Sequence, residues 1–536
     1  MASRMAGVGR VRVSLYRSIA NRVICCASSP HKNVKFGQRQ RLAASPSDRD
    51  HSTVRTRATS IVLALAAVAY LLAAETPWHA DAAVRRATGI VLAMLVLWIS
   101  EIAPLGVLAL LIPVAAMATG LLSWSGALSV WGDPIIFLNV GAFLLARALD
   151  KHGAFDWLLS EAWWKAADSR LRSAGAPLLV LLTSGMMSSV QNNTAVTAML
   201  LPVVTTIARR SACPPAVLMA LSLGATLGGM ATPIGTAPNF IGYAAMKRID
   251  PAVSFVSWMK VGLAVWLGGT LLSWAVLAIS RRWLRTAPDA TAPEDGWLAR
   301  AADADLAPAI IVANEDDAAR RRGRRAATAA LLAAATAWVG TGIIKGIHGP
   351  GTPAFLWCER YLPESLVPIA AAWVLFLVPV APGRGVLERR DFQLIDWDTV
   401  FLFAGGLCLG RTLESSGAAD ALAVAVSRAD LPPLALLFVV AGATVILSEL
   451  TSNTATAALM VPVAAALAPV VGMDAPRLIW TVALTASLGF ALPVSTPPNA
   501  LIYGTRLVPL RWMIAVGMSV DVLCVGWVVA CISLLG

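Results

Sequence analysis

Apolar residues form long runs along almost the whole chain. Four of the strongest cover residues 61–74, 90–121, 261–279 and 516–535, and the second of these continues past Pro104. Such segments are typical of transmembrane helices, which need about 20 mainly apolar residues to cross the hydrocarbon core. Because they recur from residue 58 onward, the pattern excludes a single anchor on a soluble domain. It predicts an all-α integral membrane protein.

The same pattern predicts about 11 transmembrane helices. The first is expected at 58–76, and the others at 86–101, 104–122, 134–150, 215–246, 255–280, 326–346, 364–382, 396–413, 476–504 and 512–535.

Two further apolar stretches, 176–207 and 432–470, do not fit this scheme, because each has two apolar arms separated by a polar cluster. That arrangement predicts a re-entrant hairpin. Its tip must line a cavity, since lipid offers no partner for the backbone groups there.

The polar clusters of the two hairpins resemble each other. Residues 191–203 and 451–463 share six identities in thirteen positions without a gap. The same offset of 260 residues superposes a second polar island, so that 46 residues separate the tip asparagine from the island asparagine in both halves. The island residues that match are Pro233, Thr236, Pro238, Asn239 and Tyr243 in the first half and Pro493, Thr496, Pro498, Asn499 and Tyr503 in the second. Upstream, at an offset of 264, Gly141, Arg147 and Gly153 match Gly405, Arg411 and Gly417.

The chain is therefore predicted to contain two copies of one plan, repeat 1 at 86–280 and repeat 2 at 326–536. Five predicted crossings lie between the hairpin tips, and an odd number turns the second copy upside down, which gives inverted repeats with broken helices. The basic linker 281–325 and the loop 383–395 are expected to be cytoplasmic. The N-terminus is expected on the same side, and the C-terminus on the periplasmic or extracellular side. Five basic residues oppose this rule: Arg85, Arg86, Lys247, Arg248 and Lys260.

Composition agrees with a protein in a bilayer, because 57% of the residues are hydrophobic, 14% are charged and the mean hydropathy is +0.69. Residues 1–57 carry twelve Lys and Arg against two Asp and Glu, which is +10 of the formal net charge of +12. Basicity is thus a property of this tail, interpreted as cytoplasmic and disordered, and it does not indicate a nucleic-acid-binding domain. The seven cysteines show no metal-ligand spacing and imply neither a disulfide framework nor a metal site.

The polar islands suggest how an ion could be bound. At each tip, the amide groups that begin the second arm attract an anion, and the carbonyl groups that end the first arm attract a cation. In the second island, prolines interrupt a long apolar helix, which should unwind there and free carbonyls for a hard cation. The residues expected to shape this loop are Pro233, Pro238, Asn239, Pro498 and Asn499.

The windows 184–205, 224–246, 444–467 and 484–504 contain no Lys, Arg or His. A divalent anion bound among these windows would therefore need compensating cations, and we expect bound sodium to supply them.

Other interpretations are weaker. Glu101 is interpreted as a helix-end residue at the interface, whereas Glu449 and Asp521 are left open between an ion route and a structural pairing. An enzyme would need a nucleophile, a base or metal ligands placed together, but no histidine lies in the polar islands. A structural or receptor role would leave the repeated islands without a purpose.

At these islands the sequence resembles the divalent anion:sodium symporter family of the ion transporter superfamily. The resemblance covers nearly all of the chain after residue 58, including the segment 98–104. Members of the family carry a Ser-Asn-Thr triplet at each hairpin tip. Residues Ser452, Asn453 and Thr454 match this triplet, whereas the first tip departs from it with Asn192 before Asn193 and Thr194.

The resemblance implies sodium-coupled symport of a C4 dicarboxylate such as succinate or malate, or of citrate or sulfate, by a homodimer with an elevator-type mechanism in the inner membrane. No cofactor is implied besides the coupling ion. The alternative is a sodium-independent anion exchanger or another permease of the superfamily, for arsenite or coupled to protons. The substrate-binding residues implied are Asn192, Asn193, Thr194, Thr236, Ser452, Asn453, Thr454, Thr496 and Pro497. The sodium-binding residues implied are Ser188, Asn192, Asn193, Gly235, Ser448, Thr451, Asn453 and Ser495.

Overall fold

The computed structural model describes residues 81–100, 102–155, 175–211, 213–284, 317–418, 420–421, 424 and 431–535. Within these ranges, seven helices are long and apolar enough to cross a membrane, or eight if a bent pair at 124–151 forms one span. The predicted all-α membrane class is confirmed. The total of about 11 transmembrane helices stays a prediction, because the expected span 58–76 lies outside the described residues. So do the tail 1–57, Glu101 and most of the linker 281–325.

The described helices of the first half follow the predicted order. Their bounds are α3 Ala82–Ser100, α4 Leu105–Ala109, α5 Leu111–Ala118, α6 Trp124–Leu128, the 3-10 helix η1 Ser129–Gly132, α7 Pro134–Lys151, α10 Gly175–Ser188, α11 Asn193–Arg210, α12 Pro214–Gly229, α13 Ala237–Ile249 and α14 Phe255–Leu284. The predicted helix 104–122 is divided at Leu110 and ends earlier, and the short helix α6 with η1 is not indicated by the hydrophobic pattern.

The second half contains the same types of element and one exception to the all-helical prediction. Its bounds are α16 Asp317–His348, α17 Pro353–Tyr361, α18 Leu366–Leu377, β1 Pro379–Ala381, β2 Arg384–Gly385, α19 Arg389–Gln393, α20 Trp397–Ser416, α22 Pro433–Leu450, α23 Asn453–Val470, α24 Ala475–Thr485, α25 Pro497–Gly504 and α26 Leu510–Leu535.

The predicted helix 364–382 ends at Leu377, and its last residues form β1, which pairs antiparallel with β2. Pro379 cannot donate the next helical hydrogen bond, and Gly383 adopts a φ of 71° in the turn between the strands. These two residues explain why the helix is replaced by a short ribbon.

Both long helices predicted around the second polar island are broken. The segment 215–246 is divided into α12 and α13, and 476–504 into α24 and α25. One asparagine bridges each break. The Nδ2 group of Asn239 donates to the carbonyls of Gly229 at 2.9 Å and Thr232 at 2.7 Å. The Nδ2 group of Asn499 donates to two carbonyls at the equivalent positions, each at 3.0 Å. The unwound backbone thus finds partners within the protein, as an apolar surrounding requires.

The two halves pack their helices in the same way. Hairpin helices α10 and α11 pack against α12 and each other, and α14 packs against α10 and α12. In the second half α22, α23, α24 and α26 make the corresponding five pairs. The hairpin approaches its broken helix closely, since a Cβ atom on Gly228 would lie 2.1 Å from the carbonyl oxygen of Gly185. The matched packing supports the division into repeats 86–280 and 326–536, which stays a prediction together with their inverted orientation.

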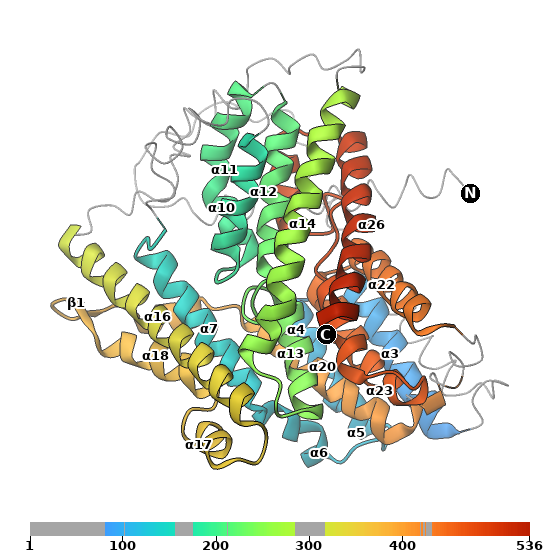
Figure 1. The fold of residues 1–536 in the computed structure, drawn as a ribbon. Coiled ribbons are helices and arrows are strands. Elements are labelled where there is room, and N and C mark those ends of the chain that lie inside the picture. The colour runs from blue at the N-terminus through green and yellow to red at the C-terminus, as the bar shows by residue number, and fades with distance from the viewer. Residues whose placement is uncertain are drawn as a thin grey trace, which may run out of the picture.

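The halves are also interlocked. Figure 1 shows α10, α11, α12, α14 and α26 standing side by side, and α14 packs along α26. Each broken helix reaches into the other half, because α13 packs against α23 and α24 while α25 packs against α11 and α12. A direct hydrogen bond from Ser222 Oγ on α12 to Asn499 Oδ1 on α25 joins them. The core of the molecule is therefore shared between the two copies.

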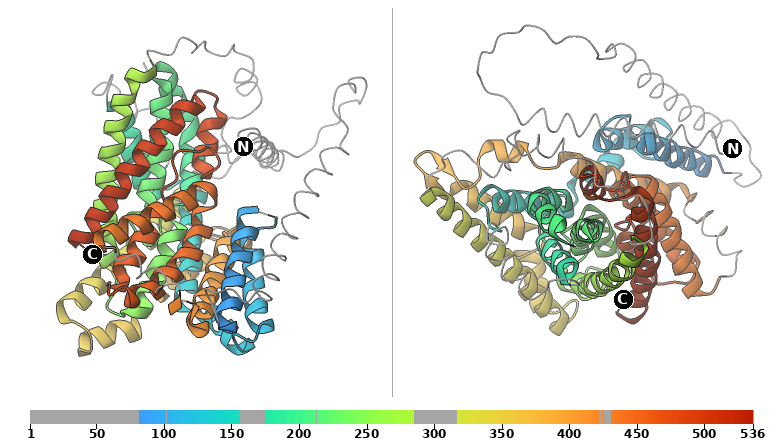
Figure 2. Two further views of the ribbon diagram at one scale, coloured as in Figure 1. Left: turned by 90° about the vertical axis from the view of Figure 1, so that its right-hand side faces the viewer. Right: turned by 90° about the horizontal axis from the view of Figure 1, so that it is seen from above.

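Two groups of helices flank this core. Helices α7, α16 and α18 pack together on one side, while α3, α4 and α5 pack against α20 on another. Seen from above, α3 to α6 and α16 to α18 occupy different edges of the molecule (Figure 2). Ion pairs connect the first group to the core: Lys247 at the end of α13 lies 3.1 Å from the buried carboxylate of Glu364, and Arg248 lies 2.7 Å from Asp133. These contacts account for two of the basic residues that oppose the positive-inside rule.

Replacing either bridging asparagine should destabilise the fold. Asn239→Ala or Asn499→Ala leaves two buried carbonyl groups without a donor, which costs about 1–3 kcal/mol for each unsatisfied group. We expect a lower temperature of thermal unfolding for both variants purified in detergent. Ser519→Ala is the control, because among the described residues the Ser519 hydroxyl donates just to the Ala515 carbonyl of its own helix, in an exposed hydrogen bond. Equal stability of Asn499→Ala and Ser519→Ala would contradict the bridging role.

Candidate functional site

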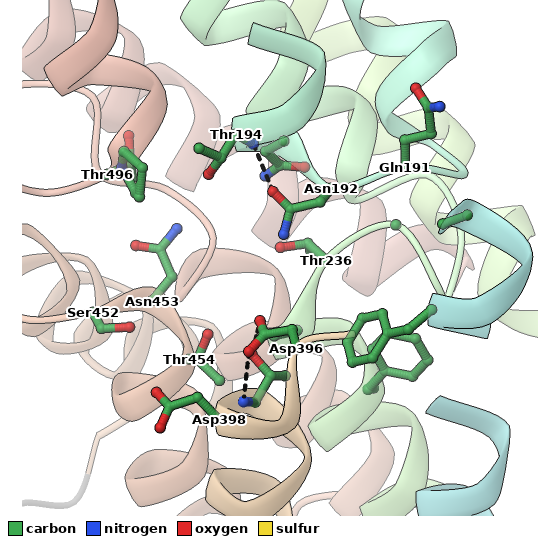
Figure 3. A pocket seen from close by; sticks show the side chains of 18 of the residues that line it. Gln191, Asn192, Thr194, Thr236, Asp396, Asp398, Ser452, Asn453, Thr454 and Thr496 are labelled. Carbon is green, nitrogen blue, oxygen red and sulfur yellow. Dashed lines mark hydrogen bonds between the residues drawn. The ribbon is translucent and has the colours of Figure 1, made fainter. Parts of the chain in front are cut away.

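A cavity of about 540 Å³ lies where the two hairpin tips and the two unwound loops meet. Figure 3 shows that side chains from both halves, among them Thr194, Asn453 and Thr496, surround one common space. The predicted site residues that line it are Asn192, Asn193, Thr194, Gly235 and Thr236 from the first half and Thr451, Ser452, Asn453, Thr454, Ser495, Thr496, Pro497 and Pro498 from the second. The structure thus brings together two sets of residues that lie about 260 positions apart in the chain.

The remaining predicted residues lie behind the cavity. Ser188 and Ser448 are fully buried one turn before each tip, and their hydroxyl groups donate to Asn193 Oδ1 at 2.6 Å and Asn453 Oδ1 at 2.9 Å. These bonds fix the orientation of the tip asparagines. The other predicted residues outside the lining are Pro233, Pro238, Asn239 and Asn499. The assignment of individual residues to substrate or sodium stays a prediction.

The two tips differ in how the second arm begins. Asn192 caps α11, because its Oδ1 atom accepts hydrogen bonds from the Thr194 amide at 2.8 Å and the Ala195 amide at 3.4 Å. Ser452 occupies the same position before α23, but its side chain makes no capping hydrogen bond. The first-turn amides of α23 are therefore available to an anion, whereas those of α11 are partly occupied by Asn192.

Two carboxylates bind the unwound loop of the second half. Glu449 accepts from the amides of Ala491 at 2.7 Å and Leu492 at 3.2 Å, and also from the Ser495 hydroxyl. Asp521 accepts from the amides of Gly489 at 3.2 Å and Phe490 at 3.3 Å.

The four amides that the two carboxyl groups bind are consecutive in the chain, from Gly489 to Leu492. The sequence had left both residues open, and the structure places them against the loop. In the first half the position of Glu449 is taken by Ser189, whose carbonyl accepts from Thr232 Oγ1 at 2.5 Å.

Four charged residues of the lining were missed by the sequence analysis. They come from α7 and from the start of α20, outside the windows around the polar islands: Arg147, Asp150, Asp396 and Asp398. Gln191 at the first tip donates to the Asp150 carboxylate, and Asp398 Oδ1 accepts from the Gly106 amide at 2.7 Å. The match of the α7 segment to the α20 segment was a signal that could have drawn attention to Arg147. The windows around the polar islands contain no Lys, Arg or His, and Arg147 brings a basic residue to the lining from α7, outside them.

Two hairpins and two broken helices around one polar cavity, within an apolar helical bundle, define a membrane transporter. A family model described as citrate transporter matches residues 95–486, and the chain belongs to this family. The resemblance drawn from the hairpin and loop motifs is thereby confirmed. The family and the relatives below are transporters and not enzymes.

The chain is similar to an uncharacterized transporter of Haemophilus influenzae, with 29% identity over 80% of this chain and 87% of that protein. It is also similar to the sodium-dependent dicarboxylate transporter SdcS of Staphylococcus saprophyticus, with 25% identity over 80% of this chain and 81% of that protein. Among solved structures, the YdaH transporter of Alcanivorax borkumensis aligns with a TM-score of 0.46 and 14% identity, covering 78% of this chain and 88% of that chain.

The difference between the tips can be tested by removing each capping side chain. Asn192→Ala deletes an oxygen that accepts two amide hydrogen bonds, so we expect a loss of about 0.5–2 kcal/mol in the free energy of unfolding. Ser452→Ala is the matched control, since Ser452 makes no capping bond, and it should leave the stability near that of the wild type. Thermal unfolding of both purified variants is the measurement. Equal losses would show that the tips are capped alike.

Proposed function

We propose that this protein, a transporter of the citrate and dicarboxylate type by family, is a sodium-coupled symporter of a divalent anion. A C4 dicarboxylate such as succinate or malate is the leading substrate, and citrate or sulfate are the others. The observation that carries the proposal is the cavity lined by both hairpin tips, with the uncapped N-terminus of α23 beside Ser452 and Thr454. Amides and hydroxyls at a helix N-terminus are suited to carboxylate oxygens.

The charge of the lining supports coupling to a cation. Three carboxylates and one guanidinium belong to the described lining, so a dianion would enter a site that is already negative. An uncompensated charge in a site of low dielectric costs several kcal/mol. Bound sodium would offset it, and oxygen atoms for a hard cation are available around Asn193 with Ser188 and around Asn453 with Ser448. A relative named as a sodium-dependent dicarboxylate transporter adds support.

The elevator-type movement, the homodimer and the placement in the inner membrane with a cytoplasmic N-terminus belong to the same proposal. The hairpins and broken helices of both halves pack into one body, and α7, α16 and α18 flank it. Contacts between the two groups include ion pairs at the end of α13 and the hydrogen bond from Gln191 to Asp150. Apolar contacts lie beside them, such as the ring of Phe255 on α14 stacked on Trp338 on α16. The polar part of this interface can exchange its partners for water at little cost.

Proton coupling is the second candidate, and one observation favours it. The carboxyl groups of Glu449 and Asp521 accept from consecutive amides of one loop, and the segments 444–467, 484–505 and 512–535 contain no Lys, Arg or His. Two carboxylates close together in a medium of low dielectric repel each other, and a proton bound by one of them would relieve the repulsion. Loss and gain of that proton during the cycle would couple transport to pH.

Uptake of labelled succinate into proteoliposomes separates these functions. We expect uptake to require an inward sodium gradient and to fall to background when choline replaces sodium, because the dianion then enters without compensating charge. Malate, citrate and sulfate are measured in parallel as competitors. Uptake that is unchanged in choline but follows an imposed pH gradient would favour proton coupling. Uptake that requires only an internal anion would identify an exchanger.

A further inference from the structure

One arginine belongs to the lining of the cavity. Arg147 on α7 is the one basic residue of the cavity lining in the described chain, and about a third of its side chain (36%) is accessible. Its counterpart in the second half, Arg411, does not line the cavity and donates instead to Ser129 Oγ at 2.7 Å. The two arginines occupy matching sequence positions but different surroundings. Any use of Arg147 for a ligand is therefore specific to the first half.

Asp391, the acidic partner of Arg147, has other hydrogen-bond donors besides this arginine. Arg147 Nε lies 3.2 Å from Asp391 Oδ1, whereas Lys151 Nζ lies closer to the other oxygen, at 2.7 Å. The Glu388 amide also donates to Asp391, at 2.9 Å. Although burial acts to raise it, the hydrogen bonds from Lys151 and the Glu388 amide keep the pKa of Asp391 below its ordinary value. Asp391 would thus stay ionised and paired with Lys151 if the Arg147 side chain turned away to bind a ligand.

The two Nη groups of Arg147, which could bind a carboxylate, are not used in the hydrogen bond to Asp391. Only Nε donates to Asp391, and neither Nη group has a hydrogen-bond partner among the described residues. The neighbouring carboxylate of Asp150 already accepts a hydrogen bond from Gln191. A guanidinium presents its donors as a planar fork that binds carboxylate oxygens in pairs, and the charge makes these hydrogen bonds strong.

We propose that Arg147 binds one carboxylate group of the substrate and thereby selects doubly charged over singly charged anions. The inference rests on the proposed transport of a divalent anion. In this arrangement, one charged end of the substrate lies at the amides of the α23 N-terminus and the other at Arg147 on α7. Arg147 then contributes affinity only when the second end is charged.

The experiment compares Arg147→Gln with Arg411→Gln for two substrates, succinate and its monoamide succinamate, which has one charge fewer. We expect Arg147→Gln to raise KM for succinate about ten- to a hundredfold, the loss expected for a charged hydrogen bond. KM for succinamate should change by less than about threefold, since its amide end gains little from a charge. Arg411→Gln should leave both values near the wild type. An equal KM of wild type and Arg147→Gln for succinate would overturn the inference.

The variant Asp391→Asn tests whether Arg147 binds the substrate or only holds the loop around α19 in place. If Arg147 only anchors the loop around α19 through Asp391, this variant reproduces the loss seen for Arg147→Gln, and that result overturns the inference. If Arg147 binds the substrate, Asp391→Asn leaves KM for succinate unchanged or lower, because the guanidinium is freed. Size-exclusion chromatography checks the folding of each variant, and should Asp391→Asn not fold, the comparison of succinate with succinamate decides. A wild type that transports no anion of the panel overturns the proposed function, and this inference with it.

Discussion

The structure depends on hydrogen-bond partners for the backbone polar groups of two unwound segments, which lie within an apolar helical bundle. Carbonyl groups freed by each break are taken up by the side-chain amide of Asn239 or Asn499. Without these bonds, the polar groups would lie in a surrounding that offers no water to replace them. The breaks in turn open the space into which the hairpin tips point. A constraint on hydrogen bonding thus produces a polar cavity in the middle of the helices.

Equivalent asparagines bind the carbonyls of the break in both halves, but the other side chains that bind the loop differ. In the second half, the carboxylates of Glu449 and Asp521 accept hydrogen bonds from four backbone N–H groups of the loop. Both carbonyl and N–H groups of the break therefore have partners. The first half has Ser189 at the position of Glu449 and a self-capped tip at Asn192. The cavity consequently has two unlike ends, one with open amides and carboxylates behind it, the other with its amides partly occupied.

Much of this organisation could be predicted from the sequence, because the same motifs recur at the same spacing in both halves. The common spacing of 46 residues located both tips and both loops, and prolines at Pro233 and Pro493 predicted the breaks. Charged residues on helices outside the islands could not be found in that way. Arg147 and Asp398 line the cavity because of the way α7 and α20 pack. The sequence around the polar islands does not reveal that packing. The ribbon of β1 and β2 was missed because a short apolar run fits a helix end equally well.

The hydrogen bond from Ser222 in the first half to Asn499 in the second has a consequence for the history of the chain. The position that matches Ser222 in the second half is Val482, so Asn239 has no reciprocal partner of this kind. The two halves thus differ at this contact. A protein assembled from two copies of the second half would carry Val482 in both and would lack the hydrogen bond, whereas two copies of the first half would keep both the serine and the asparagine.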